Sequence, residues 1–244
     1  QTNPTPQSLP YSQDFSSLAY LSTTYPTGIQ GWLISRSPGP VFNTASPMSD
    51  RRLTESATAE TTSGGIHNYN GKIGFLNTAL HDATIVLAFN TSSKSNISLS
   101  YTIMTIRNPY NGSSNTRINE VTLQYRVGTE GSFTNLTGIE YQNNTTLQVN
   151  RTTTAQNSQS RNIDLPTSCD NKPIVQVRLA SRQVSGTGLY PSFAIDNISV
   201  TGDDTLPVVL SSFTASMNAN NHVSLLWVTQ SETNALGYYA YRAD

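Results

Sequence analysis

The chain has 244 residues and a net charge of −1, and only 12% of its residues are charged. Because charged residues usually make up about a quarter of a domain, its solubility must come from hydroxyl and amide side chains. The weak net charge provides no electrostatic field for nucleic acid. No apolar run reaches the roughly 18 residues of a membrane span. We therefore expect neither a nucleic-acid partner nor insertion into a membrane.

The first third of the chain predicts short strands joined by loops. Residues 1–10, QTNPTPQSLP, are polar and rich in proline, so we expect an extended leader that packs little by itself. The segment TYPTGIQGWLIS, residues 24–35, predicts a turn followed by a strand. Residues 36–70 are rich in Ser, Pro, Thr and Gly and predict loops between short strands, and residues 72–76 predict another strand.

The middle of the chain carries the clearest strand signals. The apolar run at residues 85–89 is long enough for a buried strand, and three later segments alternate with the period of a half-buried strand. No stretch of useful length has helical periodicity, so we expect an antiparallel β-sandwich of jelly-roll type. The alternating positions are Ile97, Leu99, Tyr101 and Ile103; Val121, Leu123, Tyr125 and Val127; and Val175, Val177 and Leu179.

The segment PSFAIDNISVTG, residues 191–202, predicts the closing strand of this sandwich. Phe193 and Ile195 have odd numbers, whereas Ile198 and Val200 have even ones, so the inward face changes register at Asp196 and Asn197. A β-bulge would produce the change and would turn Asp196 out of the regular ladder toward a site. The alternative is that Asp196 caps a bend by accepting neighbouring backbone N–H groups.

Four short segments carry a resemblance: QDFSSL at residues 13–18, GWLIS at 31–35, VTLQYRVGTEGSF at 121–133 and FAIDNISVTG at 193–202. In this order they resemble the jelly-roll domains of bacterial surface proteins. These are the cleaved-adhesin and carbohydrate-binding-module group, which has a concanavalin-like sandwich. The resemblance covers residues 11–202. It implies that the first and last strands lie side by side.

The same resemblance implies a structural calcium site. In that group the Asp of the terminal Ile-Asp motif often binds Ca²⁺ together with groups from the first strand, which corresponds to Asp196, with Asp14 as a second contributor. Calcium takes six to eight oxygen ligands, so backbone carbonyls and water would supply the others. The chain departs from the group at Ser16, where many relatives have an acidic residue. The alternative is a plain hydrogen-bonded turn.

A linker at residues 203–208 separates residues 11–202 from the tail, in which Val223, Leu225 and Trp227 alternate. The tail resembles the start of a fibronectin-type-III-like module, so we expect a partial module at residues 209–244. Such a module needs about 100 residues to bury its core. The few strands of this tail must pack on the sandwich, continue into further sequence, or pair with another chain.

The linker also contains a candidate modification site. The sequence Asp-Thr-Leu around Thr205 resembles the short Asp-Thr-aliphatic motif that some bacteria O-glycosylate on exported surface proteins. We therefore predict glycosylation at Thr205.

The sequence contains none of the familiar catalytic motifs. The histidines, His67, His81 and His222, are scattered, and none lies in a recognised hydrolase or metalloprotease motif. Glycosidase chemistry needs two facing carboxylates, and candidates such as Asp82 and Glu120 fit solvated turn or strand-edge positions better than catalytic ones. We expect a protein that is not an enzyme.

A sugar-binding function requires aromatic rings that stack on the sugar and amide side chains that bond to its hydroxyls, and the chain has both. Tyr69, Tyr110 and Tyr190 lie in or near loops rich in Pro and Gly, where rings stack on sugar faces while Asn and Gln bond to hydroxyls. The alternative is that these rings pack the core or the loop bases. We expect a secreted, non-catalytic protein of the bacterial cell surface that binds a glycan or another cell-surface ligand. The alternative is a structural subunit of an extracellular filament or surface array, assembled by strand addition between copies through C-terminal or N-terminal strands.

Overall fold

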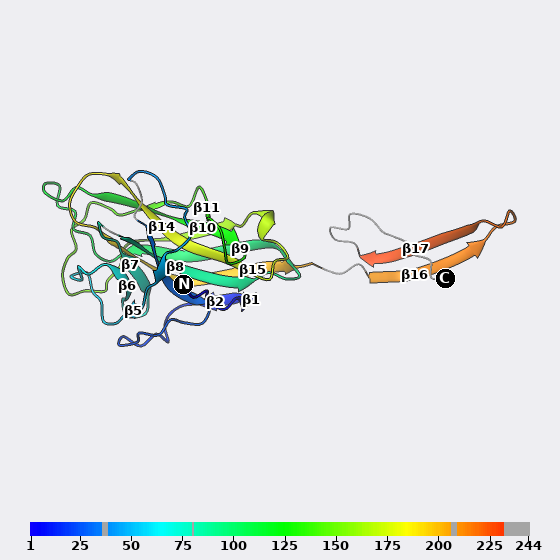
Figure 1. Ribbon diagram of the computed structural model, residues 1–244. Coiled ribbons are helices and arrows are strands. Elements are labelled where there is room, and N and C mark those ends of the chain that lie inside the picture. Colours follow the sequence, from blue (N-terminus) through cyan, green and yellow to red (C-terminus); the bar gives the residue numbers. More distant parts are fainter. Residues whose placement is uncertain (36–38, 80, 206–208, 232–244) are drawn as a thin grey trace.

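The structure, a computed structural model, describes residues 1–35, 39–79, 81–205 and 209–231. Two large sheets pack face to face as an antiparallel β-sandwich (Figure 1), which confirms the predicted all-β fold class. Only one turn of 3₁₀ helix, η1 (Thr167–Cys169), interrupts the strands within the described ranges. None of these residues belongs to a helix long and apolar enough to cross a membrane.

The eight-stranded sheet has the order β11-β10-β14-β8-β3-β4, with β1 beside β8 and β12 beside β10. Its strands are β1 (Gln7–Ser8), β3 (Ile29–Ser35), β4 (Ser49–Asp50), β8 (His81–Asn90), β10 (Ile118–Val127), β11 (Thr134–Asn135), β12 (Tyr141–Gln142) and β14 (Val175–Ser185).

The seven-stranded sheet has the order β13-β9-β15-β7-β6-β5, with β2 beside β15. Its strands are β2 (Tyr11–Gln13), β5 (Leu53–Thr54), β6 (Gly65–Asn68), β7 (Ile73–Leu76), β9 (Lys94–Thr105), β13 (Gln156–Asp164) and β15 (Ser192–Asp204).

The core lies between the two sheets and follows the predicted alternation, except at the end of β10, where Val127 is exposed. Ile97, Leu99, Tyr101 and Ile103 of β9 are all buried, because every second residue of the strand faces the opposite sheet. In the same core the ring of Phe193 lies 5.9 Å from the rings of Phe75 and Tyr141. Side chains from both sheets therefore interlock in one layer.

The closing strand has the predicted bulge. The pairing of β15 with β9 shifts register between Asp196 and Ser199, and Asn197 has a φ of 51°. Beyond the bulge, β15 pairs antiparallel with β2, so the first and last parts of the sandwich lie side by side as expected. The bulge allows Ile195 and Ile198 both to be buried although their numbers differ in parity.

The leader differs from its expected role, because it packs on the eight-stranded sheet. Pro4 is buried, and the indole Nε1 of Trp32 donates to the Thr2 carbonyl at 2.9 Å. Thr2 also donates from its backbone N and its hydroxyl to the Asp50 carboxylate, both at 2.7 Å. Gln176 donates to the Asn3 side chain at 3.0 Å. The prolines lack backbone N–H groups, so the sequence favours a leader that stays in solvent. Hydrogen bonds that join Thr2 and Asn3 to polar groups of the sheet fix it there instead.

The face of the eight-stranded sheet that points away from the core is also covered. Thr122, Gln124 and Arg126 alternate with the core residues of β10 and are nevertheless buried. Residues 39–48, the covering segment, lie over Gln124, whose side chain donates to the Asn43 carbonyl at 3.1 Å. Thr122 donates to the Leu136 carbonyl at 2.7 Å and Arg126 to the Gly131 carbonyl at 3.0 Å. These contacts give one sheet a polar buried layer in addition to the apolar core.

The tail forms a third, separate sheet from β16 (Val209–Met217) and β17 (Val223–Ser231) (Figure 1). Phe213 pairs with Trp227, Ala215 with Leu225 and Met217 with Val223. These six side chains share one face, the apolar hairpin face, and all six are exposed. Most of the predicted linker and the last part of the predicted module, residues 206–208 and 232–244, lie outside the described residues. The fibronectin-like nature of the tail therefore stays a prediction.

Candidate functional site

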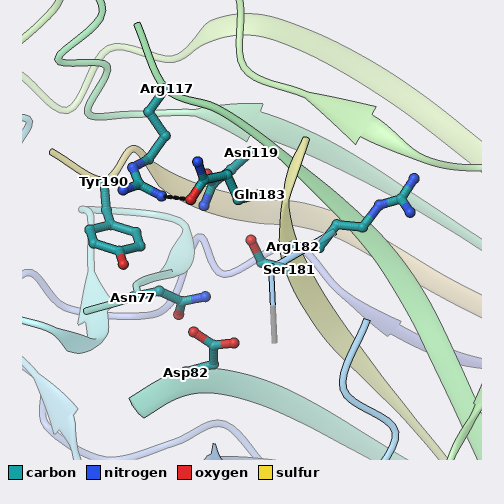
Figure 2. A pocket seen from close by; sticks show the side chains of 9 residues that line it. Asn77, Asp82, Arg117, Asn119, Ser181, Arg182, Gln183 and Tyr190 are labelled. Atoms are coloured by element: carbon teal, nitrogen blue, oxygen red, sulfur yellow. Dashed lines mark hydrogen bonds between the residues drawn. The ribbon is translucent and has the colours of Figure 1, made fainter. Parts of the chain in front are cut away.

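One end of the sandwich carries a small polar hollow with about 280 Å³ of space, part of it open to solvent (Figure 2). Its walls come from the end of β7, the start of β8, the start of β10, the end of β14 and the segment before β15. Strand ends place side chains from distant parts of the sequence next to one another here. The lining residues are Gly39, Asn77, Asp82, Arg117, Asn119, Ser181, Arg182, Gln183 and Tyr190.

Two lining side chains are buried without a hydrogen-bond partner. Asn119 is 4% exposed and its Oδ1 has no donor, and Ser181 is 4% exposed and its Oγ has neither donor nor acceptor. A buried polar atom without a partner costs about 1–3 kcal/mol, and such atoms are rare in native proteins. The hollow therefore contains two polar atoms that a bound molecule or ordered water would satisfy.

An arginine and a tyrosine form one wall of the hollow. The guanidinium carbon of Arg117 lies 4.0 Å from the centre of the Tyr190 ring. Arg117 donates from Nε to the Gly188 carbonyl at 2.8 Å and from Nη1 to the Gln183 side chain. In Figure 2 these groups stand around one side of the hollow, with Asn77 and Asp82 facing them from another side. The stack holds the Tyr190 ring in a fixed orientation beside the polar groups.

The remaining walls are held by other fixed contacts. The Asn77 side chain accepts a bond from the Ala83 N–H at 3.0 Å, which fixes its orientation between β7 and β8. Arg182 forms an ion pair with Glu120 and donates to the Pro40 carbonyl at 2.8 Å. These contacts make the hollow largely preformed, as ligand sites usually are.

The structure brings one of the three predicted ligand-binding tyrosines into this hollow. Tyr190 lines it, whereas Tyr110 is half-buried elsewhere, in the loop after β9, with its N–H 3.4 Å from the Asn108 side chain. Tyr69 is 0% exposed and packs against Ala57, Ala59 and Met104. Its ring therefore belongs to a core cluster, which corrects the expectation that it lies open to a ligand. This outcome matches the alternative that loop tyrosines pack the core.

The predicted calcium residues lie close to each other at the bulge. Asp14, Asn197 and Ser199 line a shallow groove between β2 and β15. Burial raises the pKa of Asp196, and the negative charge of Asp14 adds to that shift. Both carboxylates accept bonds from nearby N–H groups, Asp196 from Asn197 at 2.7 Å and Asp14 from Ser16 at 3.0 Å.

Those bonds agree with the alternative of hydrogen-bonded turns, and they leave further carboxylate lone pairs for an ion. Across the described ranges, no group of three or more His, Cys, Asp and Glu side chains gathers as a metal site would. A calcium ion at the bulge would therefore depend on backbone carbonyls and water for most of its ligands.

The predicted glycosylation site follows directly after β15. The Thr205 N–H donates to the Ser93 carbonyl at 2.9 Å, and the residue is half-exposed.

Sequence reasoning missed Arg117, Asn119 and Ser181. All three lie at strand ends whose strands become neighbours only in the folded sheet, where Asn119 pairs with Gln183 and Val121 with Ser181. Asn119 and Ser181 continue the alternation of the core residues on β10 and β14, and this was the one signal available in the sequence. The chain has many other Ser and Asn residues, so this signal did not distinguish these two.

No protein-family model matches the sequence, and no curated protein is significantly similar to it. Among solved structures, the chain is similar to the CBM22-1 xylan-binding domain from Paenibacillus barcinonensis Xyn10C, with 10% identity, 80% of this chain and 95% of that chain covered, and a TM-score of 0.36. It is similar to the family 11 carbohydrate-binding module of the cellulase Lic26A-Cel5E of Clostridium thermocellum, with 11% identity, 75% and 94% covered, and a TM-score of 0.31.

A third similar structure is the enzymatically active domain of the bacteriophage CBA120 tailspike protein 4. It has 7% identity and a TM-score of 0.33, and the match covers 72% of this chain and 19% of that one. The similar structures thus include both binding modules and an enzyme, and their TM-scores are nearly the same. These likenesses are too weak to assign a ligand or an activity, which must be argued from the residues of this chain.

Proposed function

We propose that this chain is a non-catalytic, extracellular glycan-binding module of a bacterial surface protein, and that the hollow beside Tyr190 is its sugar site. The observation that carries the proposal is the pair of buried atoms without partners, Asn119 Oδ1 and Ser181 Oγ. A sugar hydroxyl both donates and accepts, so it suits an amide oxygen next to a hydroxyl.

The rest of the lining fits the same ligand class. The amides of Asn77 and Gln183, the Asp82 carboxylate and the Tyr190 ring surround this small hollow, which is partly open to solvent. The low charge of the protein also favours a ligand recognised through hydroxyl groups.

The chemistry of the lining supports binding without catalysis. Asp82 is the single carboxylate among the residues that line the hollow. Hydrolysis of a glycosidic bond by the usual mechanism needs two facing carboxyl groups. A site with one carboxylate, amides and an aromatic ring is suited to holding a sugar.

The direct test is a glycan array followed by calorimetry on the best ligand. Ser181→Ala removes a buried hydroxyl that has no partner, so it should leave thermal stability unchanged and weaken sugar binding about tenfold, as the loss of one hydrogen bond does. Ser160→Ala, at an exposed position on β13, is the matched control and should bind normally. An array on which no glycan binds would contradict the proposal.

A second candidate function is self-assembly, and the apolar hairpin face favours it. Phe213 is 57% exposed and Met217 is 70% exposed, and residues 209–231 contain no Asp, Glu, Lys or Arg. A contiguous apolar face of this kind usually marks an interaction site, and unpaired strand edges invite pairing with another chain. Copies of this chain would then join through β16 and β17.

Sedimentation of the full chain tests self-assembly, and the two faces of β17 provide matched variants. Leu225→Ser changes the apolar hairpin face, whereas Leu226→Ser changes the opposite face of the same strand. We expect the first variant to dissociate assemblies and the second to leave them intact. A chain that stays monomeric at all concentrations, or variants with equal effects, would contradict assembly through this face.

A further inference from the structure

Two arginines are buried on the outer side of the eight-stranded sheet, Arg178 beneath the covering segment, residues 39–48, and Arg126 beside Gly131 and Phe133. Arg178 is 0% exposed and Arg126 is 4% exposed. Their guanidinium carbons lie 3.9 and 4.4 Å from the centre of the same ring, that of Phe133. Both charges therefore share one small region on the outer side of the eight-stranded sheet.

Neutral groups supply the hydrogen bonds of these arginines. Arg178 donates to the Gln124 side chain at 2.8 Å and to the Asn43 carbonyl at 3.1 Å. Arg126 donates to the Gln176 side chain at 2.8 Å and to the Gly131 carbonyl at 3.0 Å. Nη1 of Arg178 and Nη2 of Arg126 are buried and have no partner. Each guanidinium thus keeps one nitrogen with N–H groups that no acceptor satisfies.

No carboxylate pairs with either arginine in the part of the chain that the structure describes; the ion pairs found there involve Lys94, Arg151 and Arg182. Arg182 is the informative comparison, because it lies four residues beyond Arg178 on β14 and has Glu120 as its partner. Burial, together with the charge of Arg126, lowers the pKa of Arg178 to about 9. Glu130 supplies Arg126 with a negative charge that partly opposes the effect of burial on its pKa, whereas the charge that acts on Arg178 is the like charge of Arg126. A buried charge without a counter-charge is strongly unfavourable, so an anion would stabilise Arg178.

The covering segment connects the arginines to the hollow. Gly39 lines the hollow, Pro40 accepts a bond from Arg182, and Asn43 accepts the bond from Arg178. The segment thus runs from the hollow to Arg178. An oxyanion that displaced the Asn43 carbonyl would meet Arg178 on the outer side of the sheet, three residues along β14 from Ser181 of the hollow.

We propose that Arg178 and Arg126 bind an oxyanion carried by a sugar, a uronate carboxylate or a sulfate ester, so that the ligand is an acidic glycan. This inference rests on the proposed function of the hollow and names its ligand class. A carboxylate or sulfate offers several acceptor oxygens to two guanidinium groups, which is the geometry arginine recognises best. Neither unpartnered nitrogen is open to solvent, so binding requires the covering segment to move away from the sheet.

The test compares oligogalacturonate, a sulfated oligosaccharide and a neutral galactose oligomer of equal length, by calorimetry on the full chain. We expect at least one acidic ligand to bind ten or more times tighter than the neutral one. Arg178→Gln should remove that preference, and Arg151→Gln, at a highly exposed ion pair, should keep it. A preference for galacturonate identifies the carboxylate source, and one for the sulfated sugar identifies the ester.

Thermal unfolding shows whether a loss of binding in Arg178→Gln comes from the missing arginine or from a variant that fails to fold. Because Arg178→Gln removes an uncompensated buried charge, we expect it to fold with an unchanged or higher melting temperature. In the unaltered chain, inorganic sulfate should raise the melting temperature more than in Arg178→Gln, whose response reports the general salting-out effect.

Equal binding of acidic and neutral sugars, insensitive to Arg178→Gln, would overturn the acidic ligand and leave the sugar site standing. If no glycan binds, the proposed function fails, and the sulfate comparison still decides whether the arginines bind an anion. An equal sulfate response in both proteins would overturn the anion site.

Discussion

The sandwich and the hairpin of the tail have the same sequence pattern and opposite surroundings. Leu99, Tyr101 and Ile103 alternate along β9 and are buried by the opposite sheet. Val223, Leu225 and Trp227 alternate along β17 and are exposed. The alternation therefore specifies a strand and its apolar face, whereas the second layer that covers this face must come from elsewhere in the chain or from another molecule.

The largest expected difference between the two regions concerns their phenylalanines. Phe193→Ala removes a ring packed against Phe75 and Tyr141, so we expect the sandwich to lose about 3–5 kcal/mol of unfolding free energy. Phe213→Ala, on the exposed hairpin face, should change it by no more than about 0.5 kcal/mol. Urea denaturation followed by circular dichroism measures both. Similar losses would mean that the hairpin face is covered after all.

The next effect is a loss of sandwich stability in acid. His67 is buried, with Nε2 2.8 Å from the Ser63 carbonyl and no partner for Nδ1. Burial lowers its pKa from 6.5 to about 4. The folded state therefore favours the neutral ring, and this contribution is complete above pH 6.5 and is lost as the pH falls toward 4. The expected loss is about 3 kcal/mol.

Denaturation curves between pH 7 and pH 4 measure this loss, and His67→Gln is the control because it has no ring to protonate. The variant should lose less stability over the same interval. An identical pH dependence in both proteins would assign the loss to other groups.

The smallest effect concerns calcium at the bulge, which we propose from Asp196 and Asp14. With a dissociation constant of about 1 mM, about 10 mM Ca²⁺ would stabilise the sandwich by about 1.4 kcal/mol. Asp196→Asn should remove the effect, and Mg²⁺ should not reproduce it. A melting temperature that does not respond to Ca²⁺ at neutral pH would contradict the site.

The titration of Asp196 gives a second reading of the same site. Without calcium, its raised pKa means that the folded state favours the protonated acid, so its contribution to stability is greatest below the normal carboxyl pKa of 3.8 and is lost as the pH rises through the raised value. Bound Ca²⁺ favours the charged carboxylate and should lower that pKa. Carbon NMR of the Asp196 carboxyl with and without Ca²⁺ follows the change.

Local pattern was sufficient for the sandwich strands and for the bulge. The parity change at Asp196 and Asn197 is a property of one segment, and the register shift appears where it was expected. The pairing of β2 with β15 came from the resemblance to jelly-roll domains. These predictions succeed because strand periodicity and bulges depend on neighbouring residues.

The site depends on contacts that no single segment contains. Tyr69 lies in a loop-like sequence, NYNG, yet residues from distant segments such as Ala57 and Met104 bury it. Arg178 occupies an outward position that would be a solvated charge if residues 39–48 did not cover it. Burial on the outer side of a sheet is set by loops, and loops carry the least information in their local sequence.

The two tryptophans of the chain fall one in each region. Trp32 is wholly enclosed on the sandwich, with the Phe133 ring 6.4 Å away, whereas Trp227 is 38% exposed on the hairpin. The protein thus has a native fluorophore for each part, with blue-shifted emission expected from the enclosed indole and red-shifted emission from the exposed one. Replacing Trp32 by phenylalanine leaves Trp227 as the one tryptophan, so its emission follows docking of the hairpin without a tryptophan signal from the sandwich.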